Sequence, residues 1–114
     1  MKKTIQEVRE KLRFFNFEEY SEGWGFQRVY PQGHVGYLSP SIKVLVFLAR
    51  CQDGLHKFEV MIDYHLPIGV HDPLLWELYE KWVRLAAADA RLATAIVEGH
   101  TWTREEVNAE SGSI

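Results

Sequence analysis

Apolar residues near the N-terminus recur at the spacing of a helix. Four of them are three or four positions apart and share one helical face: Ile5, Val8, Leu12 and Phe15. Thr4 and Glu7 have the spacing of a capping box, in which each side chain bonds the backbone amide of the other residue. We therefore predict an amphipathic helix over residues 5–15 that ends at Asn16.

The middle of the chain changes to the short alternating or β-branched segments that are typical of strands. Four such segments are separated by turn residues: 24–30, 34–38, 42–50 and 57–64. Residues 42–50 are apolar on both faces, which predicts a central position in the sheet. Consecutive segments joined by short turns predict an antiparallel four-stranded meander.

The Asp53-Gly54 pair is a strong signal for a hairpin between the last two strands, because both residues tolerate positive φ. If they are the two central turn residues, Ala49 lies opposite Phe58 and the core face continues from that pair. The other face then carries four apolar residues: Val44, Val46, Leu48 and Met61. We expect either the rest of the chain or a binding partner to cover this second face.

A long helix is predicted after the last strand. Asp72 can cap its exposed amides, and Pro73 loses no hydrogen bond at the first helical position. The helix carries one apolar stripe made of Leu75, Leu78, Trp82, Leu85 and Ala86. A second stripe consists of Trp76, Tyr79 and Val83. Gly99 is expected to end the helix, and the capping-box pair Thr103 and Glu106 opens a last short one.

These elements predict one α+β domain over residues 1–114, with residues 110–114 as a loose tail. The order is an N-terminal helix, the antiparallel four-stranded meander, and C-terminal helices packed on the sheet. Helices gathered on an antiparallel sheet form a two-layer architecture. The length of 114 residues fits a single domain.

The charge pattern argues against binding to double-stranded nucleic acid. The net charge is -3 with neutral histidines, and basic residues are scattered, whereas a duplex-binding protein usually has a basic face. Four aromatic residues in or beside the strands could still stack on bases: Trp24, Phe26, Tyr30 and Tyr37. A single-stranded nucleic-acid accessory factor is therefore an alternative function.

Two further features bear on the compartment. Cys51 is the only cysteine, so an intramolecular disulfide is excluded and a reducing compartment is favoured. The longest apolar run, residues 44–49, is too short to span a bilayer. We therefore expect a cytoplasmic protein without a membrane partner.

The stretch around His65, His71 and Asp72 contains the residues that come nearest to a chemical site. Two imidazoles and a carboxylate could bind a metal ion if the loop between them folded back. A small metal- or histidine-dependent enzyme is thus another alternative. However, the sequence has no HExxH, CxxC, GxSxG, P-loop or GxGxxG motif. We assign no catalytic residue and no cofactor, and we interpret Asp72 as a helix cap.

The function that the sequence favours is protein binding. We predict a small non-enzymatic accessory protein, such as an inhibitor encoded by a phage or mobile element, that acts on another protein. The predicted interface combines the second helical stripe with the second sheet face: Trp76, Tyr79, Val83, Val44, Val46, Leu48 and Met61. Large apolar side chains that one fold cannot bury are typical of interfaces. A homodimer through the same surfaces is the variant of this hypothesis.

Overall fold

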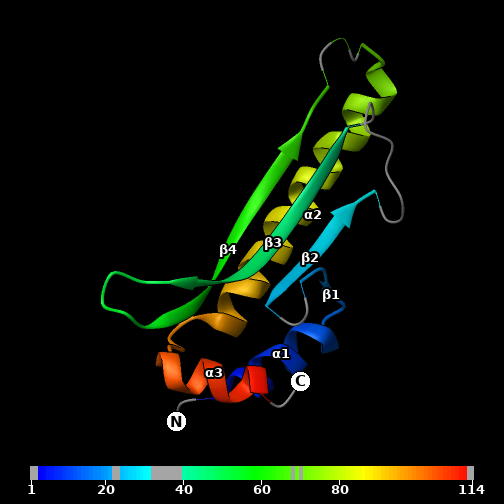
Figure 1. Ribbon diagram of the computed structural model, residues 1–114. Coiled ribbons are helices and arrows are strands. Elements are labelled where there is room, and N and C mark those ends of the chain that lie inside the picture. The colour runs from blue at the N-terminus through cyan, green and yellow to red at the C-terminus, as the bar shows by residue number, and fades with distance from the viewer. Residues whose placement is uncertain (1–2, 22–23, 32–39, 68, 70, 113–114) are drawn as a thin grey trace.

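In the computed structural model the described residues are 3–21, 24–31, 40–67, 69 and 71–112. They form these helices and strands: α1 (Ile5–Phe14), β1 (Glu18–Glu19), β2 (Gly25–Tyr30), β3 (Ser41–Arg50), β4 (His56–His65), α2 (Pro73–Val97) and α3 (Arg104–Gly112). α2 crosses one face of the sheet, and α1 and α3 lie together at one end of the molecule (Figure 1). The predicted α+β architecture is confirmed, with an N-terminal helix, an antiparallel four-stranded meander and C-terminal helices.

The sheet has the order β1-β2-β3-β4, and each neighbouring pair is antiparallel. One strand was not predicted: β1 consists of two residues between the predicted helix over 5–15 and the first predicted strand over 24–30. It pairs with β2 through Glu18 opposite Gln27 and Glu19 opposite Phe26. The strand predicted over residues 34–38 lies outside the described residues. β3 and β4 are the longest strands, and β4 is at the edge of the sheet.

The predicted register of the β3–β4 hairpin is wrong by one residue. Ala49 lies opposite Lys57 instead of Phe58. The turn has three residues, because Cys51 N donates to Leu55 O at 2.7 Å and closes a loop over residues 52–54. Gly54, with φ of 85°, is the residue in the left-handed region, as in three-residue hairpin loops.

A shift of one residue exchanges the two faces of a strand. The face of β3 that packs under α2 therefore carries Ile42, Val44 and Val46, all fully buried. The prediction that Val44 and Val46 belong to an interface with a partner is wrong, since both side chains are 0% exposed. The opposite face of β3 carries Lys43, with Leu45 and Phe47 only half-buried.

Local signals at the helix ends agree with the structure. Thr4 and Glu7 form the capping box of α1, and Asn16 follows the helix with φ of 67°. Asp72 Oδ1 accepts a hydrogen bond from Leu74 N at 3.0 Å at the start of α2. α3 continues through Gly112, so residues 110–112 are helical where the sequence predicted a loose tail.

The molecule is elongated, with principal dimensions of 50 × 28 × 24 Å. Its Cα radius of gyration is 16.1 Å, compared with about 13 Å expected for a compact chain of this length. The long axis follows β3, β4 and α2 (Figure 1). Within the described part of the chain, no helix is long and apolar enough to cross a bilayer. An elongated shape leaves a long sheet edge and much of α2 at the surface.

Candidate functional site

Within the part of the chain that the structure describes, the outer edge of β4 is the main feature without a strand partner. Cys51 and Leu55 form a hydrogen-bonded pair of the β3–β4 ladder, and such pairs alternate along antiparallel strands. Every second residue of β4 from Lys57 to His65 therefore bonds β3. The residues between them direct N–H and C=O away from the sheet: His56, Phe58, Val60, Ile62 and Tyr64.

The first of these outward positions is already occupied. His56 N donates to Trp102 O at 2.7 Å, and Trp102 N donates to His56 O at 2.8 Å. The segment 99–101 then runs beside Phe58, where both line one pocket. Among the described residues, no backbone hydrogen bond reaches the outward groups of Val60, Ile62 and Tyr64. We call these three residues the free edge of β4.

A groove follows this edge between β4 and α2. Its volume is about 410 Å³, and its lining residues are Val60, Met61, Ile62, Ala90, Arg91, Thr94, Ala95 and Glu98. On the α2 side of this β4–α2 groove, the side chains of Ala90, Thr94 and Ala95 are short. They therefore leave the side chains of Val60 and Ile62 accessible to solvent. A second pocket of about 360 Å³ shares Val60, Thr94 and Glu98 and extends the groove towards the segment 99–101.

Exposed aromatic side chains lie at the far end of the free edge. Tyr64 is 54% exposed. The pKa of Tyr79 is raised mainly by its own burial and secondly by the electrostatic effect of Tyr64. The ring of Tyr79 is also 6.1 Å from that of Trp76, which is 38% exposed. The exposed rings of Tyr64 on β4 and Trp76 on α2 therefore add aromatic surface at this end of the molecule.

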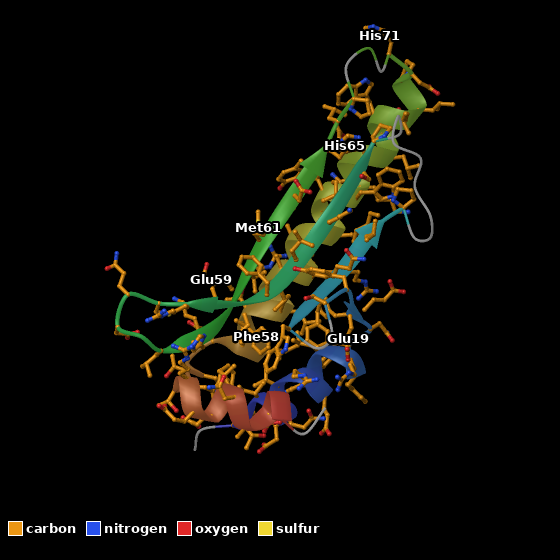
Figure 2. All side chains as sticks on the ribbon, in the orientation of Figure 1. Glu19, Phe58, Glu59, Met61, His65 and His71 are labelled. Atoms are coloured by element: carbon orange, nitrogen blue, oxygen red, sulfur yellow. The ribbon has the colours of Figure 1, made fainter. Side chains whose placement is uncertain are left out.

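The structure separates the predicted interface residues into three groups: exposed, half-buried and core. Met61 is 47% exposed and lies on β4 beside the groove (Figure 2). Trp76 is also at the surface, whereas Val83 and Leu48 are half-buried and pack against the core. Tyr79 is only 8% exposed, because it lies with Trp82 and Ala86 on the buried face of α2. Tyr79, Val44 and Val46 are thus core residues that cannot contact a partner.

The sequence pattern did not point to Val60, Ile62 and Tyr64 as binding residues. One signal could have found them: the last predicted strand, residues 57–64, is long and contains no proline. A terminal strand of that length without a protecting proline or bulge is open to pairing with another chain. The predicted meander order already places this last strand at an edge of the sheet, and the structure confirms that order.

Charges along the free edge are balanced. Lys57 Nζ lies 3.8 Å from Glu59 Oε1, and Asp63 lies opposite Lys43 across the ladder. On the α2 side, Arg91 and Glu98 line the same groove. No single sign of charge dominates, so the edge does not select for a strongly basic or acidic partner.

The residues proposed for a metal-dependent enzyme do not form a ligand set. His65 ends β4, and His71 lies at the tip of the following loop (Figure 2). Asp72 is occupied as the cap of α2. No group of three or more His, Cys, Asp or Glu side chains that could hold a metal ion occurs in the described ranges.

The aromatic residues considered for nucleic-acid stacking are not arranged as a platform. Phe26 and Tyr30 point into the layer between the sheet and α2, where both are buried. The guanidinium of Arg9 lies over the Trp24 ring, 5.3 Å from its centroid. Tyr37 lies outside the described residues. Phe26 and Tyr30 are therefore not accessible to bases.

A polar cluster joins β2 to α2. The Tyr30 hydroxyl donates to Asp89 Oδ2, and Arg28 Nε lies 3.6 Å from the same oxygen. Burial, followed by the hydrogen bond to Asp89, raises the pKa of Tyr30 to about 12. Because a raised pKa keeps the hydroxyl protonated, Tyr30 is a stable donor and not an activated nucleophile. The cluster is a structural link between the two layers.

A polar cleft of about 550 Å³ separates the β3–β4 hairpin from α3. Its lining includes cationic Arg50 and Arg104 together with acidic Asp53 and Glu105. The first amides of α3 are occupied by the predicted capping box, in which Glu106 N donates to Thr103 Oγ1 at 3.2 Å. Mixed charge and an occupied helix start make this cleft a weaker candidate than the free edge.

Comparisons of the chain with protein-family models, with curated proteins and with solved structures gave no match.

Proposed function

We propose that this chain is a non-catalytic protein-binding module that takes up an extended polypeptide segment as an added strand at the free edge of β4. The observation that carries the proposal is the row of outward backbone groups on Val60, Ile62 and Tyr64, which have no backbone partner among the described residues and lie beside an apolar groove. Strand addition to an exposed sheet edge is a common mode of peptide recognition. Each of the three residues offers one N–H and one C=O to the incoming strand.

The backbone bonds supply general affinity, and the groove supplies selectivity. A net contribution of about 1 kcal/mol per hydrogen bond is partly offset by the cost of ordering the incoming segment. Useful affinity therefore depends on side chains that alternate towards the β4–α2 groove. Apolar residues at those positions would contact Ala90 and Thr94 on α2 and would cover Val60 and Ile62 on β4.

The proposal includes the role expected from the sequence, that of an accessory or inhibitory protein in a reducing compartment such as the cytoplasm. A lone cysteine, Cys51, is compatible with that compartment. Inhibition would follow if the captured segment were needed elsewhere in the partner protein.

A peptide selection tests the proposal. The chain is used as bait against a display library of random linear peptides, and selected peptides are then added to the labelled protein. We expect the amide hydrogens of Val60, Ile62 and Tyr64 to exchange more slowly with solvent, because they become donors to the bound strand. Selected peptides that bind without slowing any of these three amides would show that the free edge is not the binding site.

A further inference from the structure

We propose that the strand captured at the free edge is β4 of a second copy of this chain, paired antiparallel about a twofold axis at Ile62. This inference rests on the proposed function and names its partner. The two sheets would then join into one continuous sheet through their β4 strands. Three features of β4 support this register: the alternation of its hydrogen bonds with β3, the occupied position at His56, and the charges beside the edge.

Only a few registers are possible for a symmetric antiparallel pairing of β4 with β4 of a second copy. Hydrogen bonds form only between residues that both face outward, and a twofold axis makes the pairing the same from either side. Three registers use at least three of the outward residues from Phe58 to Tyr64. They are centred on Val60, on Met61 and on Ile62.

The register centred on Val60 is blocked by the protein itself. It places Tyr64 of the second copy opposite His56. That position is held by Trp102, which exchanges two hydrogen bonds with His56 at 2.7 and 2.8 Å. The edge is already closed at this point.

The register centred on Met61 brings like charges together. It places Glu59 opposite Asp63 of the second copy, and symmetry repeats the pair. These would be non-hydrogen-bonded pairs, in which facing side chains are closest. Like charges directly opposite each other destabilise strand pairing.

The register centred on Ile62 avoids both conflicts and is complementary in charge and shape. Glu59 faces His65 of the second copy, and Asp63 faces Met61. Each Val60 pairs with the exposed ring of Tyr64, an aromatic and β-branched combination that favours strand pairing. β4 ends at His65, so the second copy leaves the sheet before it reaches the segment beside Phe58.

The same arrangement accounts for the groove. A twofold axis perpendicular to the sheet puts both α2 helices on one face, on either side of the β4–β4 junction. Ala90 and Thr94 lie on the side of α2 that lines the groove, and such small side chains let a second helix come close. The elongated single chain, with its radius of gyration of 16.1 Å, would then be one half of a broader two-layer assembly.

Disulfide trapping tests the register in a Cys51→Ser background, where each variant has a single cysteine. In the proposed register two Ile62 residues face each other with Cα atoms about 5.5 Å apart, within the range of a disulfide. We expect Ile62→Cys to form a covalent dimer under mild oxidation. Met61→Cys is the matched control. Residue 61 is more exposed, so random collisions alone would cross-link it faster than residue 62. In the proposed register, however, the two residues 61 lie diagonally and not opposite each other, so Met61→Cys should cross-link more slowly than Ile62→Cys. Faster cross-linking of Met61→Cys would overturn the inference.

Sedimentation equilibrium tests the dimer without a cross-link. Tyr64 N–H points away from β3, so Tyr64→Pro removes no bond of the ladder but two bonds of the proposed dimer. Tyr64→Thr is its control, since it removes the ring and keeps the N–H. We expect a dimer for the wild-type chain and a dissociation constant at least about tenfold higher for Tyr64→Pro than for Tyr64→Thr. Equal constants, or a wild-type monomer at all soluble concentrations, would overturn this inference. If selected peptides still slow the hydrogen exchange of the Val60, Ile62 and Tyr64 amides, the proposed function would stand even without the dimer.

Discussion

At the scale of single residues, the most informative group is the Tyr30 hydroxyl. It donates to Asp89 across the layer between β2 and α2, and its pKa is raised to about 12 from 10.0. A raised pKa means that the folded chain holds this proton more tightly than the unfolded chain does. The stability from this group is therefore complete below pH 10 and is lost as the pH rises towards 12.

Tyr30→Phe removes this dependence. At neutral pH the variant should be about 1 kcal/mol less stable, because Asp89 loses a buried donor. Between pH 10 and 12 the free energy of unfolding of the wild-type chain should fall more steeply than that of the variant, by about 2–3 kcal/mol in total. Urea unfolding at a series of pH values measures both effects. Parallel pH profiles would show that Tyr30 ionises as freely as an exposed tyrosine.

Gly54 is the residue on which the hairpin turn depends. Its φ of 85° is readily adopted by glycine, and an added Cβ would meet no atom within 4 Å. Gly54→Ala should therefore cost about 1–2 kcal/mol from backbone strain alone. Gly54→Asn should cost less, because asparagine tolerates the left-handed region. Thermal unfolding of both variants checks the prediction, and an equal loss in both would indicate a different cause.

At the scale of elements, the register of β3 against β4 decides which residues form the core. The Asp53-Gly54 pair predicted a two-residue turn, and the three-residue turn moved every cross-strand pair by one position. Hydrophobicity could not correct the error, because β3 is apolar on both faces. The choice between the faces is made by the packing of α2, which covers Val44 and Val46.

The same substitution on opposite faces of the sheet tests this assignment. Val46→Thr places a hydroxyl in the apolar core without a hydrogen-bond partner and should lower the free energy of unfolding by about 1–3 kcal/mol. Val29→Thr, on the opposite face of β2, should cost only about 0.5 kcal/mol. Denaturant unfolding gives both values. A larger loss for Val29→Thr would mean that the two faces are exchanged.

At the scale of the whole molecule, Trp102 connects parts that are distant in sequence. It is 1% exposed, its ring packs 5.8 Å from that of Phe58, and its Nε1 donates to Lys3 O at 3.0 Å. Its backbone also closes the sheet edge at His56. One residue therefore holds the N-terminus, β4 and the segment before α3 together.

Trp102→Ala should destabilise the chain by about 3–5 kcal/mol, a large part of the stability of a small domain. Trp102→Phe should lose less, because it keeps most of the apolar volume and loses the bond to Lys3. Guanidinium unfolding followed by far-ultraviolet circular dichroism measures the difference. If only the N-terminal segment loosens while the unfolding midpoint stays unchanged, Trp102 is a local clamp and not a core residue.

Much of the fold was predictable from local patterns. The capping boxes at Thr4 and Thr103, the Asp72-Pro73 helix start and the turn at Gly54 all depend on contacts within a few residues. Such contacts are encoded by neighbouring residues, and so they can be read from a single sequence. The class, one helix followed by an antiparallel meander and further helices, follows from adding them together.

The candidate site was not predictable in the same way. Of the residues expected at an interface, Met61 and Trp76 are at the surface, whereas Val44, Val46 and Tyr79 are in the core. The apolar character of these side chains was evident, but their exposure depends on register and helix rotation. The free edge is a backbone feature of Val60, Ile62 and Tyr64, and side-chain chemistry alone does not reveal it.

The sequence by itself determined where the three helices begin and where the β3–β4 hairpin turns, because these features arise from short-range hydrogen bonds and steric preferences. Only the tertiary structure decided which face of β3 is buried and which side of α2 meets the sheet. Each of these outcomes depends on the pairing of segments far apart in the chain. Their relative free energies are set by the complete packing of the core, and no local segment contains that information.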